Sequence, residues 1–386
     1  MPWSQYDINL CSPIGVPVAV IDDASTLEYA RAVNTVGACT LIIPYTDRRW
    51  SLACTDAILN IWRRDDLGTR RRPMDTLWLL RKRKKSLGAD GSLVMVLTFV
   101  DLMEVLTRRM IAYPELSARA NRTGPVDDVI RQIVRDNYTD IDYTDPYCLH
   151  QPGGNLGTWM NVESDAGAGA TVLDASPFGN VLSTIQALAQ SVWVTSRQYV
   201  AFDFEVQSLL SLAFRVYMGA RGTDRTQKGS KPLTLSPESG TLGIVDYEED
   251  WSTAATWVIV CGAGTGVDQV FGTCAVAGSP NSPFGAIEYL ETATTTSDDS
   301  ALVQVATAAA RQQRPTAQFT ASIQQSAGFL YGRDFEFGDK LTVHFGQQAL
   351  TARLDGLHVT VTGQDGAEQF DGTFQAELFE DIPGGW

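Results

Sequence analysis

Three stretches of the sequence carry residue types that could do chemistry, and the first is WVIVCGAGTGV, from Trp257 to Val267. An apolar run that feeds a glycine cluster is how a dinucleotide-binding fold begins, and that fold requires the spacing G-x-G-x-x-G. Gly262, Gly264 and Gly266 are evenly spaced, and Val267 stands where the third glycine of the motif should fall. The residues that follow lack the apolar stripe of a helix. The stretch therefore predicts two strands joined by a glycine turn, and no bound cofactor.

The second stretch is the acidic run DNYTDIDYTD, from Asp136 to Asp145, which has enough carboxylates for a calcium ion. An EF-hand loop starting at Asp140 would place Asp145 where the turn needs glycine. It would also place Gln151 where the loop needs a bidentate glutamate. We therefore expect a solvated turn and no metal site.

The third stretch is YEEDW, from Tyr247 to Trp251, which combines carboxylates with aromatic rings as glycosidases do. Successive strand residues point to opposite faces, so Glu248 and Glu249 cannot flank one glycosidic bond. No G-x-S-x-G, S-x-x-K or H-E-x-x-H motif surrounds the histidines of the chain, which are His150, His344 and His358. No catalytic residue is predicted, and we expect the protein not to be an enzyme.

Charge is unevenly distributed along the chain, which has 386 residues and a formal net charge of -15. Between Trp62 and Lys85, ten basic residues stand against three acidic ones, which gives this segment a charge of +7. Its densest part is the run RKRKK, which consists of Arg81, Lys82, Arg83, Lys84 and Lys85. Because the rest of the surface repels phosphate, sequence-specific DNA binding is not expected. The run is either a solvated hairpin tip before the turn LGADG or a contact for an acidic partner subunit.

The elements that must position these residues are mostly strands. Segments rich in Val, Ile, Thr and aromatic residues, separated by Gly, Asp, Asn or Pro, predict a mainly β architecture, and Val192 to Val206 is the longest of them. Three amphipathic helices are also predicted: Pro125 to Asn137, a second that opens at Ser176-Pro177 and continues to Ala189, and a third from Ser297 to Arg314-Pro315. We expect their apolar faces to pack on a sheet.

Neither a signal peptide nor a membrane span is evident, because the longest apolar run, Leu93 to Val100, is too short to cross a bilayer. Six scattered cysteines without CxxC spacing indicate neither a zinc site nor a disulfide framework.

Three segments, in this order, resemble hub proteins of the baseplate or tail tip of tailed bacteriophages. In RAVNTVGACTLIIP, from Arg31 to Pro44, an arginine, an asparagine and a glycine precede a strand that ends in proline. In VLTRRM, from Val105 to Met110, a leucine precedes paired arginines, here Arg108 and Arg109. The late segment LYGRDFEFGDKLTV is similar to the Gly-Asp block of these hubs through Tyr331, Gly332, Asp334, Phe335, Gly338 and Asp339.

The resemblance implies a mainly β fold with helical insertions, in which two tail-tube-like β-barrel domains carry two smaller α+β accessory domains. Together with breaks in composition, it suggests four regions. These are a first tube-like barrel (1–112), a helix-containing accessory insertion (113–175), a second β-rich domain with an amphipathic helix (176–290) and a C-terminal α+β or β-barrel segment (291–386).

The resemblance further implies a structural virion protein without catalytic chemistry. Three copies would form a ring with pseudo-sixfold symmetry below the tail tube, and DNA would pass only transiently through its lumen. An acidic wall suits such a conduit because it offers few lysines or arginines to phosphate. The implied partners are distal tail and tail tube proteins, the tape measure protein and central fibre or tip proteins, in a virion tail assembled in the host cytoplasm. The alternatives are a distal tail or receptor-binding subunit, and a carbohydrate-active hydrolase.

Overall fold

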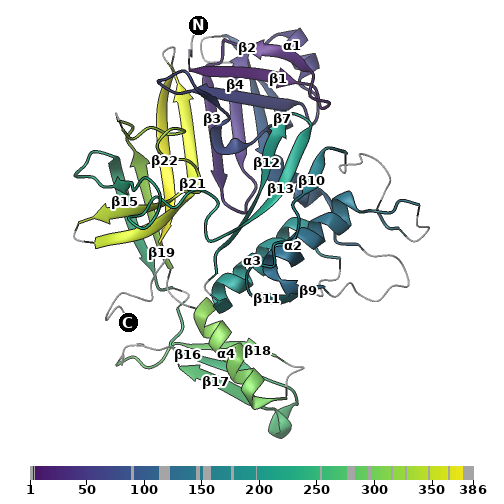
Figure 1. Cartoon of the computed structure of the whole chain (residues 1–386), viewed down its shortest axis with the longest axis vertical. Coiled ribbons are helices and arrows are strands. Elements are labelled where there is room, and N and C mark those ends of the chain that lie inside the picture. Colours follow the sequence, from purple (N-terminus) through teal and green to yellow (C-terminus); the bar gives the residue numbers. More distant parts are fainter. Residues whose placement is uncertain are drawn as a thin grey trace.

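The computed structural model (Figure 1) describes residues 3, 5–87, 91–112, 122–144, 148–150, 158–174, 178–196, 198–252, 254–275, 283–293, 297–313, 316–326, 328–346, 348–363 and 366–376. In chain order the strands are β1 (Tyr6–Cys11), β2 (Pro17–Ile21), β3 (Thr26–Ala32), β4 (Ala38–Pro44), β5 (Ile58–Arg64), β6 (Arg70–Arg71), β7 (Trp78–Leu87), β8 (Leu93–Asp101), β9 (Arg122–Pro125), β10 (Met160–Val162), β11 (Thr171–Asp174), β12 (Val200–Ser208), β13 (Ser211–Met218), β14 (Thr234–Leu235), β15 (Leu242–Asp250), β16 (Trp257–Cys261), β17 (Phe271–Ala275), β18 (Glu288–Thr292), β19 (Thr316–Ile323), β20 (Lys340–Phe345), β21 (Gln348–Thr362) and β22 (Ala367–Ala376). The α-helices are α1 (Asp47–Leu52), α2 (Val126–Val134), α3 (Val181–Ser196) and α4 (Asp299–Gln312). Short 3-10 or π turns cover Pro73–Asp75, Leu102–Arg108, Arg135–Thr139 and Gly266–Asp268.

One large sheet joins the early and late parts of the chain. It has 14 strands, and its main path runs β15-β19-β22-β21-β3-β4-β8-β7-β5-β1-β2. The late strand β21 pairs antiparallel with the early strand β3, with Gly356 opposite Ala32 and Thr362 opposite Thr26. In Figure 1 the yellow strands β21 and β22 accordingly lie beside the purple strands of the N-terminal part.

Alternation along the strands buries one face of this sheet. The opposite face, which we call the uncovered face, stays exposed except where β1, β5 and β7 contribute Cys11, Ile58 and Leu79 to the second core. In β3, Leu27 and Tyr29 are buried while Glu28 between them is exposed. In β8, Leu97 and Phe99 are buried, whereas Thr98 remains partly exposed. The buried side chains from both parts of the chain form a single hydrophobic cluster, so the two parts share a core.

A second core lies between the large sheet and the helices α2 and α3. The three-stranded sheet β10-β13-β12 contributes Phe202, Phe204 and Phe214 to it. The apolar faces of α2 and α3, which include Ile130 and Ile185, pack in the same cluster. This packing confirms that these two amphipathic helices cover a sheet.

The end of α3 differs from the sequence-based expectation. The helix continues to Ser196, so the predicted strand from Val192 to Val206 is wrong over its first residues, and β12 begins only at Val200. Val192 lies three residues beyond the buried Ala189, which keeps it on the apolar face of the helix and extends that face. The predicted helix opening at Ser176-Pro177 lies outside the described residues.

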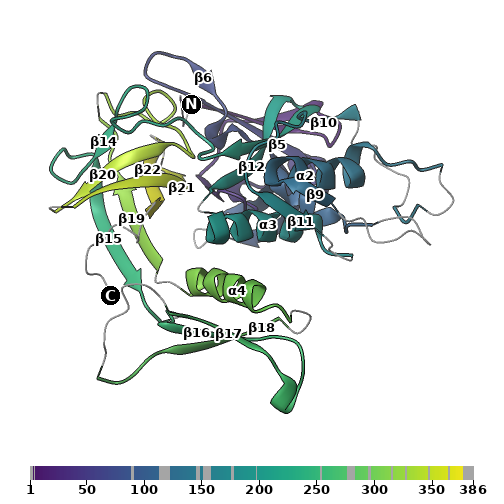
Figure 2. The same ribbon diagram turned by 60° about the horizontal axis from the view of Figure 1, so that its bottom comes forward.

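A small separate unit consists of the sheet β17-β16-β18 and α4, which lies along one face of it (Figure 2). Val258 and Val260 of β16 pack against Leu302 and Ala306 of α4. The segment WVIVCGAGTGV forms β16 and the glycine turn, and β16 pairs antiparallel with β17. The predicted pair of strands is therefore confirmed. The Arg314-Pro315 stop after α4 lies outside the described residues.

The prediction of a mainly β fold with helical insertions is confirmed. The described strands close no barrel, however, because the path of the large sheet ends at β15 on one side and at β2 on the other. The division into regions 1–112, 113–175, 176–290 and 291–386 stays a prediction. No helix within the described ranges is long and apolar enough to cross a membrane.

A partly buried hydrogen bond connects the small-sheet side of the second core to the large sheet. The Tyr199 hydroxyl, just before β12, donates to Asp355 Oδ1 of β21 at 2.7 Å. Burial raises the pKa of the Asp355 carboxyl to about 6, although the hydrogen bond from Tyr199 and the charge of Arg353 act to lower it. The Arg353 guanidinium also lies 4.1 Å from the centre of the Tyr199 ring.

This shifted carboxyl predicts a pH-dependent stability. The native state binds a proton at Asp355 more tightly than the unfolded state does, so Asp355 favours folding less as pH rises from about 4 to above 6. Asp355→Asn stays neutral and still accepts from Tyr199. Its free energy of unfolding should therefore exceed that of the wild type at pH 7.5, by up to about 3 kcal/mol, and the gap should shrink towards pH 4. Urea denaturation at several pH values checks this, and a gap that does not change with pH would contradict it.

Candidate functional site

The first resemblance segment contains a buried arginine that holds four parts of the chain together. Arg31, on β3, is only 4 % exposed. Its Nε donates to Asp101 Oδ2 and its Nη2 to Asp203 Oδ1, both at 2.6 Å, and both aspartates are buried. Its Nη1 donates to the Met74 carbonyl oxygen at 2.6 Å. We call Arg31, Asp101 and Asp203 the arginine clamp, because they join β3, the end of β8, the Pro73–Asp75 turn and β12.

The two carboxyls of the clamp are affected differently. Burial raises the pKa of Asp101, and the charge of Arg31 only partly offsets it. Burial acts in the same direction on Asp203, but Arg31 and Arg221 together outweigh it and lower the pKa of that carboxyl. Arg221 Nε lies 2.6 Å from Asp203 Oδ2, so Asp203 has two guanidinium partners.

The other two members of the first segment support the clamp. Asn34 has a positive φ of 62°, and its side chain accepts from the Phe202 amide and donates to the Val200 carbonyl oxygen, both at 2.8 Å. Position 37 has no room for a side chain, because a Cβ on Gly37 would lie 2.6 Å from Arg31 Cγ and 3.0 Å from Asp101 Oδ2. Both residues thus fix the β3–β4 turn against β12 and the clamp.

The clamp and the third resemblance segment meet at one turn. Met74 and Asp75 both adopt positive φ, 56° and 50°, which is strained for residues other than glycine. The Met74 amide donates to the Tyr331 hydroxyl at 3.0 Å, while Arg31 binds its carbonyl oxygen. Residues from two distant segments therefore hold this turn in its unusual conformation.

The remaining residues of the third segment build the loop that carries Tyr331. Gly332 and Gly338 have φ of 83° and 88°, values that glycine adopts without strain. Asp334 accepts from the Leu330 amide at 2.9 Å. Asp339 is buried and accepts from the Thr223 amide at 2.6 Å and from Arg225 Nε at 2.7 Å. All of these contacts are structural.

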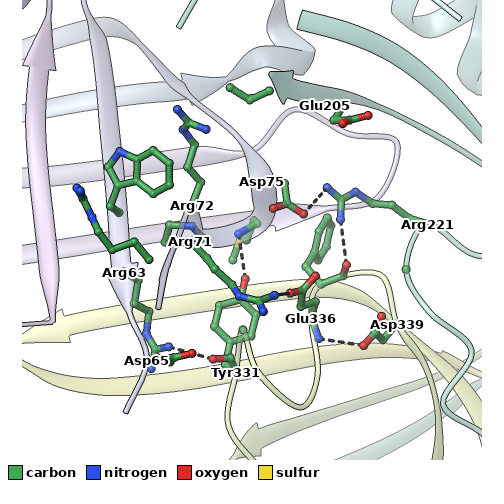
Figure 3. Close-up of a pocket in the computed structure, with 18 of the residues that line it drawn as sticks. Arg63, Asp65, Arg71, Arg72, Asp75, Glu205, Arg221, Tyr331, Glu336 and Asp339 are labelled. Carbon is green, nitrogen blue, oxygen red and sulfur yellow. Dashed lines mark hydrogen bonds and ion pairs between the residues drawn. The ribbon is translucent and has the colours of Figure 1, made fainter. Parts of the chain in front are cut away.

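The turn and the loop border a cleft of about 650 Å³, shown in Figure 3. Arg63, Arg71 and Arg72 line it from β5 and the segment that follows. Glu205 and Arg221 line it from β12 and the stretch after β13, and Tyr331, Glu336 and Asp339 line it from the late loop. Three parts of the chain that are distant in sequence therefore surround one cleft.

The paired arginines of the second segment lie elsewhere. Arg108 binds Glu104 at 2.6 Å and Asp56 at 2.8 Å. Arg109 donates to the Asn137 carbonyl oxygen and to the Tyr143 hydroxyl, both at 3.1 Å. They attach the Leu102–Arg108 turn to its neighbours and do not contribute to the cleft.

The basic run lies in a strand and not at a hairpin tip, since Arg81 to Lys85 belong to β7. Arg81 lies 3.1 Å from Asp56, and the Arg83 guanidinium lies 4.4 Å from the centre of a Trp50 ring. Lys85 Nζ lies 3.8 Å from the centre of the Tyr45 ring. Lys82 and Lys84 are exposed on the opposite face. The turn that was predicted after the run includes residues 88–90, which lie outside the described residues.

The acidic stretches YEEDW and DNYTDIDYTD lie apart from each other and form no common site in the described residues. Glu248 is exposed on the uncovered face of β15, whereas Glu249 lies on the other side and accepts from the Tyr247 hydroxyl at 2.7 Å. Much of DNYTDIDYTD forms the π turn Arg135–Thr139 and the residues after it. Over the described ranges, no group of three or more His, Cys, Asp or Glu side chains is arranged to hold a metal ion.

The partners of the clamp are not evident from the sequence alone. The one available signal is Asp203, because a lone aspartate in the apolar run VAFDFEV indicates a buried ion pair. Asp101, Asp75 and Arg221 carried no local signal, because their roles depend on contacts between distant segments.

Comparisons with known proteins agree on the fold. The model of the family described as Siphovirus ReqiPepy6 Gp37-like protein matches residues 17–374. A search of curated protein sequences found no match.

Solved structures of three tail proteins are similar to the chain. The tail protein from Neisseria meningitidis MC58 is 14% identical, with 96% of each chain covered and a TM-score of 0.55. The prophage MuSo2 43 kDa tail protein from Shewanella oneidensis is 8% identical, with 97% of this chain and 99% of that chain covered and a TM-score of 0.59. The prophage tail protein gp18 from Listeria monocytogenes EGD-e is 9% identical, with coverage of 98% and 96% and a TM-score of 0.50. At these identities the similarity establishes the fold.

The clamp gives a direct test of what holds these parts together. Arg31→Met leaves two buried carboxylates without their shared cation, so we expect the free energy of unfolding to fall by about 3–5 kcal/mol. The control Arg49→Met removes a more exposed pair with Asp23 and should cost less than about 1 kcal/mol. Urea denaturation measures both. Equal losses for the two variants would show that the clamp does not hold the fold together.

Proposed function

The chain belongs to the family of Siphovirus ReqiPepy6 Gp37-like proteins, and on this premise we propose that it is the hub of a phage tail tip or baseplate. The fold that it shares with solved tail proteins supports a structural role in the tail. In this proposal three copies form a closed ring that continues the tail tube and adapts sixfold symmetry to threefold.

The observation that carries the proposal is the eight-stranded stretch of the large sheet from β15 to β7. Four strands of the late part, β15, β19, β22 and β21, lie beside four strands of the early part, β3, β4, β8 and β7. One chain thus offers two four-stranded units side by side. Three chains offer the six units that a sixfold tube requires, through a repeated head-to-tail interface.

This stretch is open along β15 at one end and along the part of β7 beyond Leu80 at the other, and these two open edges are oppositely charged. Among the described strands, β15 pairs only with β19, and β7 beyond Leu80 pairs only with β8. Asp246 and Glu248 are exposed on the uncovered face at the β15 end, and Lys82 and Lys84 are exposed on the same face at the β7 end. Pairing β15 of one copy with β7 of the next extends the sheet and brings the opposite charges together.

Lys82 and Lys84 also protect the open edge of β7 before the neighbouring subunit binds. An open strand edge pairs readily with any other chain, and lysines on it prevent such pairing. The acidic edge of β15 can still pair with this strand, because its carboxylates neutralise the charge of the lysines. Within the predicted contact from Arg81 to Lys85, the structure therefore favours Lys82 and Lys84 as the residues that meet a partner, since Arg81, Arg83 and Lys85 contact side chains of their own chain.

The uncovered face fits the wall of the proposed channel. One row across it consists of Gln369, Thr360, Glu28, Thr40, Thr98 and Lys82. Three of these six side chains are threonines, and Lys82 at the β7 end is the one cation among them. Such a row offers phosphate little positive charge, which suits the transient passage of DNA. The proposed neighbours are distal tail and tail tube proteins, the tape measure protein and central fibre or tip proteins, and the proposed location is the virion tail after assembly in the host cytoplasm.

Charge exchange between the two edges tests the ring. We expect Lys82→Glu with Lys84→Glu, and separately Asp246→Lys with Glu248→Lys, each to reduce assembled tails at least tenfold, because like charges then face each other. The four substitutions together should restore assembly. Lys228→Glu with Lys231→Glu changes the same charge on exposed lysines away from both edges and serves as the control.

Electron microscopy of tails counts assembled particles, and a three-dimensional reconstruction of the wild-type tip counts the copies of this chain. Three copies around the channel support the hub. One, five or six copies contradict it and favour a distal tail or receptor-binding subunit. Normal assembly by both half-exchanged variants would show that β15 and β7 are not the interface.

A further inference from the structure

One arginine at the cleft lacks the carboxylate partner that its neighbours have. Arg72 is half-buried, and no carboxylate in the described part of the chain lies within ion-pair distance of it. Its guanidinium lies 4.2 Å from the centre of the Trp62 ring, and its Nε donates to Asn60 Oδ1 at 3.2 Å. Burial lowers the pKa of the Arg72 guanidinium, and the attraction of Asp75 only partly offsets this. The cation is therefore partly removed from water without a full counter-charge.

The other arginines that line the cleft are paired within the chain. Arg63 binds both oxygens of Glu368 at 2.7 Å, and Arg71 binds Glu336. Arg70 lies 2.9 Å from Asp7, and Arg221 binds Asp203. Against this background Arg72 is distinctive, because its free donors line a cleft of about 650 Å³ that is large enough for a peptide segment.

The surroundings of Arg72 define the chemistry of an occupant. A guanidinium stacked on an indole ring is held in one plane and can bind a carboxylate through two parallel hydrogen bonds. The same cleft also presents the carboxylates of Asp75, Glu205 and Glu336, which repel a polyanion. Nucleic acid and polyphosphate therefore do not fit, whereas an isolated carboxylate flanked by uncharged or basic residues does. Val206, Tyr217 and Phe337 add apolar contact for the remainder of a peptide.

We propose that this cleft binds a peptide segment of another protein of the tail, and that a single Asp or Glu side chain of that segment pairs with Arg72. This inference rests on the proposed tail function but not on the ring interface. The cleft lies on the side of β5, β12 and the Tyr331 loop, and none of its lining residues belongs to β15 or to the basic run of β7. The two contact surfaces can thus be tested separately.

A zero-length cross-link in assembled tails tests the proposal. Arg72→Lys keeps the positive charge and introduces an amine that a carbodiimide joins only to a carboxylate in contact with it. We expect mass spectrometry to find the introduced lysine linked to an Asp or Glu of a different tail protein. Arg71→Lys is the matched control, because its amine should link to Glu336 of its own chain. Wild-type tails, which have arginine at both positions, should give neither product.

A second variant measures the contribution of the charge. Arg72→Gln should reduce the amount of the cross-linked partner in purified tails at least tenfold, while the melting temperature of the isolated chain and the copy number in the ring stay unchanged. If the Arg72→Lys variant links only to residues of this chain, with the control link present, the inference is overturned and the hub proposal is left intact. Absence of the chain from the tail would overturn the hub proposal itself.

Discussion

The fold depends on a buried cluster of one arginine and two aspartates, which hydrophobic cores normally avoid. Removing a guanidinium and two carboxylates from water is costly, and hydrophobic side chains of similar size could fill the same space at lower cost. The arginine clamp fixes the relative positions of the segments that it joins. Its hydrogen bonds at 2.6 Å connect Arg31 to Asp101, Asp203 and the Met74 carbonyl oxygen in fixed directions. Apolar contacts are not directional and could not set this arrangement. The strained turn, and therefore the cleft beside it, exists because the clamp and Tyr331 hold both of its peptide groups.

The spacing and composition of residues within a segment were sufficient to predict the helices and strands that depend mainly on contacts within that segment. The apolar stripes that include Ile130 and Ile185 identified α2 and α3. The β-branched and aromatic content of β8 indicated a strand, but not which of its faces is buried. The glycine-rich segment could be assigned to strands because a missing third glycine excludes the phosphate-binding turn. The sequence could also show that Arg31, Gly37 and Tyr331 form a recognisable pattern, but not that Arg31 and Tyr331 meet at Met74.

Features set by distant contacts could not be predicted from the sequence. No local signal pairs β21 with β3, so the predicted closed barrels gave way to one continuous open sheet. The run from Arg81 to Lys85 has a composition typical of a solvated tip, yet pairing with β8 keeps it extended. In the sequence Arg72 is one of ten basic residues between Trp62 and Lys85. Its distinct character emerges only when the partners of the neighbouring arginines are known.

The pairing of late strands with early ones also determines when each edge of the sheet comes into existence. β7 and β8 are consecutive, so the basic edge can form as soon as that hairpin leaves the ribosome. The acidic strand β15 is held by β19, which in turn rests on β22, and the contact between Glu28 and His358 spans 330 positions. The acidic edge therefore joins the sheet only after the last strands of the chain have been synthesised. In the proposed ring, nascent chains on one messenger RNA therefore carry only the basic one of the two edges, and the order of translation keeps incomplete chains from pairing with one another.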